Sequence, residues 1–113
     1  MRVRVIEPYQ RPFNDPLVVG TGEPVEPDFD RPTDIEGWVW CIAGDGRAGW
    51  TPRGWLVEAA DGWHVDRPYS AVELTVAAGE VLDVEYEESG FYWVTSEDGR
   101  AGWVPCRNVT AIA

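Results

Sequence analysis

The hexapeptide Asp-Gly-Arg-Ala-Gly-Trp occurs twice in this chain of 113 residues, at positions 45–50 and 98–103. The residues around it are also similar, because positions 37–52 align with positions 90–105 and nine of the sixteen pairs are identical. Two copies at this spacing predict a duplicated small domain rather than a solenoid, which needs at least three repeats.

Two further pairs of segments extend the match toward the N-terminus. LVVGTGEPV at 17–25 corresponds to LTVAAGEVL at 74–82, at an offset of 57, and VIEPY at 5–9 corresponds to VDRPY at 65–69, at an offset of 60. The offset at the hexapeptide is 53, so the first copy is longer by three residues in one connection and by four in the next. Length differences confined to connections are typical of loops.

Local patterns predict that both copies are built from strands. Aromatic and β-branched residues flank Asp45-Gly46 and Asp98-Gly99, and an Asp-Gly pair tolerates the positive φ angles of a tight hairpin turn. In GEVLDVEYEE, the apolar residues Leu82, Val84 and Tyr86 alternate with acids, so we expect these three on a core face. No segment has helical periodicity over two turns. About five short strands per unit would close most economically as a small barrel.

The chain is strongly acidic, with a net charge of −11 and arginine as its only basic residue type apart from one histidine. Both halves contribute, since residues 1–61 hold 6 arginines against 11 acids and residues 62–113 hold 3 against 9. This charge argues against nucleic acid and anionic membrane as partners and favours a basic protein or peptide. It could also serve only to keep the protein soluble. No signal peptide or membrane-spanning run is visible, so we expect a cytoplasmic protein.

Few residues offer catalytic or metal-binding chemistry. The two cysteines, Cys41 and Cys106, stand at non-equivalent positions of the alignment, no CxxC spacing occurs, and His64 is the only histidine. We therefore expect free thiols, no metal site and no cofactor. No nucleophile stands with a base, and the acids alternate along strands or lie at turns, so the sequence predicts a protein that is not an enzyme.

The order of the motifs carries a resemblance to a known family. The first copy runs VIEPY, LVVGTGE, EGWVW, DGRAGW and TPRGWLV, and the second runs VDRPY, LTVAAGE, SGFYW, DGRAGWV and PCRNV. Each resembles an Src-homology-3 (SH3) domain of the variant kind found in bacterial proteins. The resemblance covers almost the whole chain. It implies an all-β protein of two tandem five-stranded SH3-like barrels, packed together, with the first over 1–61 and the second over 62–113.

The resemblance also implies a peptide groove lined by aromatic residues, with acidic loops that pair with a basic ligand residue. Such grooves bind proline-rich segments, which lose little entropy on docking. Glu7 and Arg67 depart from the family by replacing its first groove tyrosine, and the first unit keeps more of the groove, so we expect it to be the better binder. Its groove residues would be Tyr9, Trp38, Pro52 and Trp55, with the loop acids Asp15, Asp34 and Glu36; the equivalents in the second unit are Tyr69, Phe91, Pro105 and Asn108.

The expected function is a non-catalytic adaptor that binds a basic or proline-rich protein segment. One alternative is an acidic regulatory or scaffolding subunit of a dedicated complex that uses no peptide groove, and a third is cell-wall binding. The remaining tryptophans leave other uses open, because such side chains can also form a core, a contact between the units or the interface of a homodimer. They are Trp40, Trp50, Trp63, Trp93 and Trp103. Trp63 follows Ala-Ala-Asp-Gly, residues 59–62, which we expect to be a brief linker between the two units.

Overall fold

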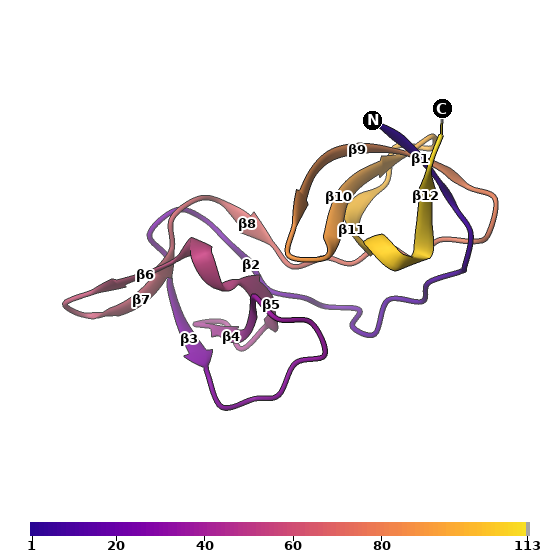
Figure 1. The fold of residues 1–113 in the computed structure, drawn as a ribbon. Helices are drawn as coiled ribbons and strands as arrows, with labels where there is room; N and C mark the ends of the chain where they lie inside the picture. The colour runs from indigo at the N-terminus through magenta and orange to yellow at the C-terminus, as the bar shows by residue number, and fades with distance from the viewer. Residues whose placement is uncertain (113) are drawn as a thin grey trace. The chain divides into compact units, whose positions relative to one another are not determined.

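The computed structural model describes residues 1–112 and shows an all-β protein, which confirms the expected class (Figure 1). Short strands are joined by turns and by two single turns of 3-10 helix, η1 (Arg53–Trp55) and η2 (Cys106–Asn108). The strands are β1 (Arg2–Val5), β2 (Val18–Val19), β3 (Pro24–Asp28), β4 (Trp38–Ala43), β5 (Ala48–Pro52), β6 (Leu56–Ala59), β7 (Gly62–Val65), β8 (Tyr69–Ser70), β9 (Val81–Glu88), β10 (Phe91–Ser96), β11 (Ala101–Pro105) and β12 (Val109–Ala111).

The chain divides into two compact units, and the division differs from the expected boundary between residues 61 and 62. Unit 1 consists of Met1–Asn14 together with Glu73–Ala113, and unit 2 consists of Asp15–Val72. Unit 2 is therefore continuous in sequence and interrupts unit 1. The difference arises because unit 1 takes β1 from the first half of the chain, whereas unit 2 takes β7 and β8 from the second half, with β8 paired to β2 in a separate two-stranded sheet.

In unit 1, β1 from the N-terminus completes a sheet whose other strands come from the second sequence copy. The strand order is β11-β10-β9-β1-β12, and the sheet is not closed into a barrel by a further ladder. Val3 of β1 lies opposite Leu82 on one side and Ala111 on the other. Val3 and Val5 are both 1 % exposed while Arg2 and Arg4, which alternate with them, face solvent, as expected for a strand with one buried face.

In unit 2, β7 takes the place that β1 takes in unit 1. The strand order is β5-β4-β3-β7-β6, and Trp63 of β7 lies opposite Val25 on one side and Glu58 on the other. Trp63, Val25 and Glu58 align with residues 3, 82 and 111 of unit 1, at the sequence offsets of 60, 57 and 53. The two sheets therefore have equivalent strand orders with a different chain path.

A tight turn explains the different path. The segment Ala-Ala-Asp-Gly, which the sequence suggests is a linker, instead joins β6 to β7 through the two residues Ala60 and Asp61, and Gly62 has a φ of +127°. Pairing across so short a turn has a small loop-closure cost, so β7 pairs locally with β6. In unit 1 the corresponding strands, β12 and β1, are nearest the two chain ends and lie side by side (Figure 1). Unit 2 is thus a circular permutation of the unit 1 arrangement.

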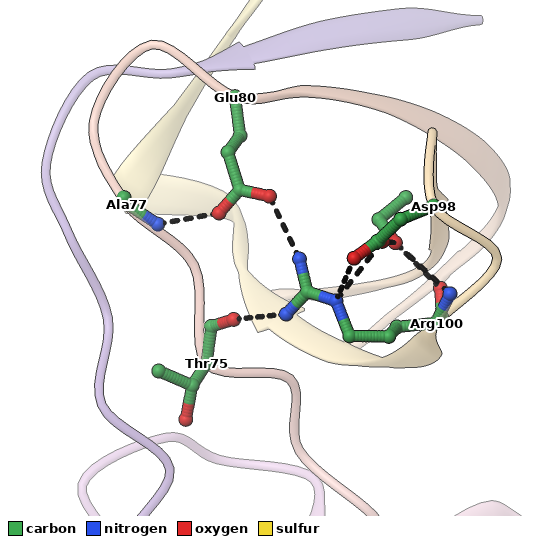
Figure 2. Close-up of polar contacts among 6 residues, drawn as sticks. Thr75, Ala77, Glu80, Asp98 and Arg100 are labelled. Atoms are coloured by element: carbon green, nitrogen blue, oxygen red, sulfur yellow. Dashed lines mark hydrogen bonds and ion pairs between the residues drawn. The ribbon is translucent and has the colours of Figure 1, made fainter.

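The hexapeptide forms equivalent hairpins, as predicted. Gly46 and Gly99 each have a φ of +88° in the turns of the β4–β5 and β10–β11 hairpins. In unit 1 the arginine of the motif ties two turns together: Arg100 donates to Asp98 at 2.9 Å, to Glu80 at 2.8 Å and to the carbonyl of Thr75 at 2.9 Å (Figure 2). The other oxygen of Glu80 accepts from the amide of Ala77 (Figure 2).

One strand residue does not face the core as predicted. Leu82 is buried and Val84 packs against the core, but Tyr86 is 44 % exposed. The β9–β10 register shifts between Trp93 and Val94, so that β9 has one extra residue and Tyr86 emerges on the outer face. A β-bulge inserts one residue in this way and reverses the alternation beyond it.

The two cores occupy corresponding positions but differ in composition. Unit 1 packs Val3, Val5, Leu74, Val76, Leu82, Val94, Val104 and Val109 into one cluster. In unit 2 the positions that align with Val94 and Val104 hold Cys41 and Thr51, and both are fully buried. Among residues 1–112, the hydroxyl of Thr51 is the buried side-chain polar atom that lacks a partner of ordinary hydrogen-bond geometry; its polar neighbour is the thiol of Cys41. A buried hydroxyl without a partner reduces the stability of unit 2.

We expect the fragment 15–72 to fold alone, because it contains all five strands of the unit 2 sheet. The fragment 15–61 should remain unfolded, since it lacks β7 and leaves β3 and β6 without their shared neighbour. Amide dispersion in NMR spectra and thermal melts distinguish the two. An unfolded 15–72 fragment would contradict the strand assignment.

Thr51→Val should raise the melting temperature by a few degrees, because it keeps the side-chain shape while removing a buried hydroxyl whose desolvation costs about 1–3 kcal/mol. The matched Thr51→Ala variant should lower it by leaving a cavity. Equal destabilisation by both variants would show that the hydroxyl has a stabilising partner.

Candidate functional site

We refer to Trp38, Pro52, Trp55 and Tyr69 as the aromatic cluster of unit 2. Tyr69 takes the position in which the sequence placed Tyr9. Trp38 lies opposite Pro52 in the β4–β5 ladder, and the ring centroids of Trp55 and Tyr69 are 5.6 Å apart at an interplanar angle of 87°. The hydroxyl of Tyr69 donates to the carbonyl of Trp50 at 2.6 Å. The exchanged strand carries this tyrosine into unit 2, because Tyr69 follows β7 by only a few residues.

The cluster is mostly buried. Trp38 and Tyr69 are 6 % and 5 % exposed and Pro52 is fully buried, whereas Trp55 is half-buried. Arg67 covers part of this indole, with its guanidinium carbon 4.0 Å from the centroid of the Trp55 ring. The same guanidinium donates to Asp66 at 2.6 Å and thereby lowers the pKa of that carboxyl. Trp55 is therefore the accessible aromatic member of this cluster, and Arg67, which was not among the predicted groove residues, covers part of it.

The predicted loop acids all lie in unit 2 and are exposed. Asp15 lies 4.0 Å from a guanidinium nitrogen of Arg47, and Asp34 and Glu36 lie in the connection between β3 and β4. This connection belongs to a strongly acidic segment, residues 23–36, with six carboxylates and one arginine. Unit 2 as a whole has 11 acids against 4 arginines, so its surface attracts cations.

In unit 1, the corresponding residues make contacts within the fold and do not line an open aromatic surface. Asn108 is buried, and its side-chain amide donates to the carbonyls of Glu7 and Pro8 at 3.1 and 3.3 Å. Phe91 lies opposite the buried Pro105 in the β10–β11 ladder. The predicted second-unit set is therefore divided, with Tyr69 in unit 2 and the other three residues in unit 1.

Tyr9 forms a partly buried pair in unit 1. Its hydroxyl donates to Glu73, and its backbone pairs with Val76. Burial raises the pKa of Glu73, and burial together with this hydrogen bond raises the pKa of Tyr9. The amide of Arg11 donates to the hydroxyl of Thr75 at 3.1 Å. These contacts join the two segments at which the chain leaves and re-enters unit 1.

The surface of each unit has a hollow. The hollow in unit 2 contains none of the predicted groove residues, and the hollow in unit 1 contains one of them, Tyr9. The hollow in unit 2, of about 390 Å³, is lined by Phe29, Arg53, Leu56 and Trp63, with the Phe29 and Trp63 ring centroids 5.3 Å apart. The hollow in unit 1, of about 440 Å³, is lined by Pro8, Tyr9, Gln10, Thr75, Val76, Ala77 and Glu80. Sequence reasoning missed the first, because it placed Trp63 in a linker rather than a strand.

The remaining chemical groups are ordinary. Both cysteines are free thiols, and burial raises the pKa of each to about 11, so neither is a reactive thiolate near neutral pH. His64 is half-buried in β7. Within residues 1–112, no group of three or more His, Cys, Asp or Glu side chains is placed to hold a metal ion. The same residues include no helix with the length and hydropathy needed to span a membrane.

The chain was compared with family models, with curated proteins and with solved structures, and none of the three searches found a match.

Proposed function

We propose that the chain is a non-catalytic binding module of two SH3-like units, and that unit 2 holds a basic or proline-rich segment of a partner protein. The equivalent strand orders, the Asp-Gly hairpins and the 3-10 turn before the last strand of each sequence copy support the family assignment. The cluster of Trp38, Pro52, Trp55 and Tyr69 supports the position of the site.

The stacking of Arg67 on Trp55 carries the proposal. The guanidinium lies 4.0 Å from the ring centroid, close enough for a favourable cation–π interaction. Arg67 belongs to the same unit and is itself exposed, so a partner arginine can replace it on the indole without unfolding any strand. The stacked Arg67 side chain therefore indicates that the surface at Trp55 accepts a guanidinium group.

The charge of unit 2 favours the same partner. Its exposed acids, including Asp15, Asp34 and Glu36, give unit 2 a negative potential, which accelerates association with a basic segment and weakens as salt is added.

One observation favours the alternative of an acidic scaffold that uses no groove. Trp38, Pro52 and Tyr69 are buried, so little of the aromatic cluster meets a partner without rearrangement. A scaffold that acts through its charge alone would bind with strong salt dependence but would not respond to changes at Trp55.

Trp55→Ala should weaken binding to basic proline-rich peptides about 5- to 30-fold, which corresponds to the loss of about 1–2 kcal/mol of stacking. Arg67→Ala should strengthen it, because the competing cation is removed. Fluorescence anisotropy with labelled synthetic peptides measures both effects, and Thr21→Ser, an exposed and charge-neutral change in the connection between β2 and β3, serves as a control. Unchanged affinity in both the Trp55 and Arg67 variants, with melting temperatures preserved, would exclude this site.

A further inference from the structure

A row of three neighbouring aromatic side chains in unit 1 lies on the outer face of its sheet, the face that points away from Val94; Tyr86 is exposed and Trp93 is half-buried, whereas Trp103 is buried. Tyr86, Trp93 and Trp103 lie directly opposite one another on β9, β10 and β11. The centroid of Trp103 is 5.6 Å from that of Tyr86 and 5.3 Å from that of Trp93. Val94 is fully buried, so the neighbouring Trp93 points away from the core, and the residues paired with it share that face.

Carboxylates lie on both sides of this row. On the same outer face, Asp83 is paired with Thr95 and Glu88 is paired with Phe91, one on each side of the Tyr86–Trp93 pair. Asp83 is exposed and forms a surface ion pair with Arg2, with a nitrogen-to-oxygen distance of 3.3 Å. Such exposed pairs contribute little energy, so the Asp83 carboxylate remains available to another cation. The face thus combines aromatic rings with negative charge.

The corresponding face of unit 2 indicates which group this arrangement accepts. There Trp40 and Trp50 are paired across β4 and β5 with centroids 5.2 Å apart, much as Trp93 and Trp103 are in unit 1. The guanidinium carbon of Arg31 lies 4.1 Å from the centroid of Trp40 and 5.8 Å from that of Trp50. An arginine side chain therefore covers the tryptophan pair in unit 2.

We infer that the outer face of unit 1 at Tyr86 and Trp93 is a binding site for an arginine side chain of a partner protein. Tyr86 is 44 % exposed and Trp93 is half-buried, so a guanidinium can stack on them from solvent. Arginine fits better than lysine, because its planar group stacks on a ring while its N–H groups donate to carboxylates at the rim. The site is in the other unit from Trp55 and does not depend on the function proposed for that residue.

The test is an NMR titration of the full chain with the peptide acetyl-Gly-Arg-Gly-amide. The peptide should shift the indole N–H of Trp93 saturably, and the citrulline peptide, which has nearly the same shape without the charge, should not. Tyr86→Ala and the double variant Asp83→Asn with Glu88→Gln should each weaken the interaction several-fold, while Trp55→Ala should leave the Trp93 response unchanged. The double variant keeps every aromatic contact, so its effect does not depend on packing.

The Arg31→Ala variant provides a second, independent test of the inference. Removal of this side chain should expose the tryptophan pair of unit 2 and add a second arginine-dependent response at the indole of Trp40. The inference is overturned if the Trp93 resonance does not move with the arginine peptide, if the citrulline peptide moves it equally, or if Tyr86→Ala and the acid-to-amide variant both bind as the wild type does.

Discussion

The two-residue turn between β6 and β7 determines how this chain is divided. It places β7 next to β6 at minimal loop-closure cost, and β7 then fills the space between β6 and β3. Once that place is taken, β1 can complete only the other sheet, between β9 and β12. The interrupted course of unit 1 and the continuous course of unit 2 both follow from this one local pairing.

The exchange of strands also redistributes the aromatic residues. Tyr69 follows β7 into unit 2, where it packs against Trp55, while Tyr9 follows β1 into unit 1 and binds Glu73. The more complete aromatic cluster is thereby combined with Arg67 and with the more acidic unit. In unit 2 an arginine stacks on tryptophan in two places, Arg31 on Trp40 and Arg67 on Trp55, and both arginines belong to unit 2. The chain thus holds several aromatic surfaces suited to cations and covers some of them with its own side chains.

The sequence predicts the local elements well and the long-range pairing poorly. Asp45-Gly46 and Asp98-Gly99 mark their hairpins because few other residue pairs tolerate the turn, and the alternation around Leu82 identifies a core strand. The strand exchange could not be predicted, because residues 2–5 and 62–65 hold aligned positions and either can occupy either sheet. The bulge that turns Tyr86 outward has no clear sequence signal, and Trp63 was misplaced because its hairpin turn was interpreted as a linker.

The cross-strand contacts of β1 and β7 test the exchange most directly. In a uniformly labelled sample, nuclear Overhauser effects between the backbone protons of Trp63 and Val25, and between those of Val3 and Leu82, are expected from the observed registers. Contacts of Trp63 with Leu82 and of Val3 with Val25 would instead show that each sequence copy keeps its own first strand, and would contradict both the division into units and the position of Tyr69.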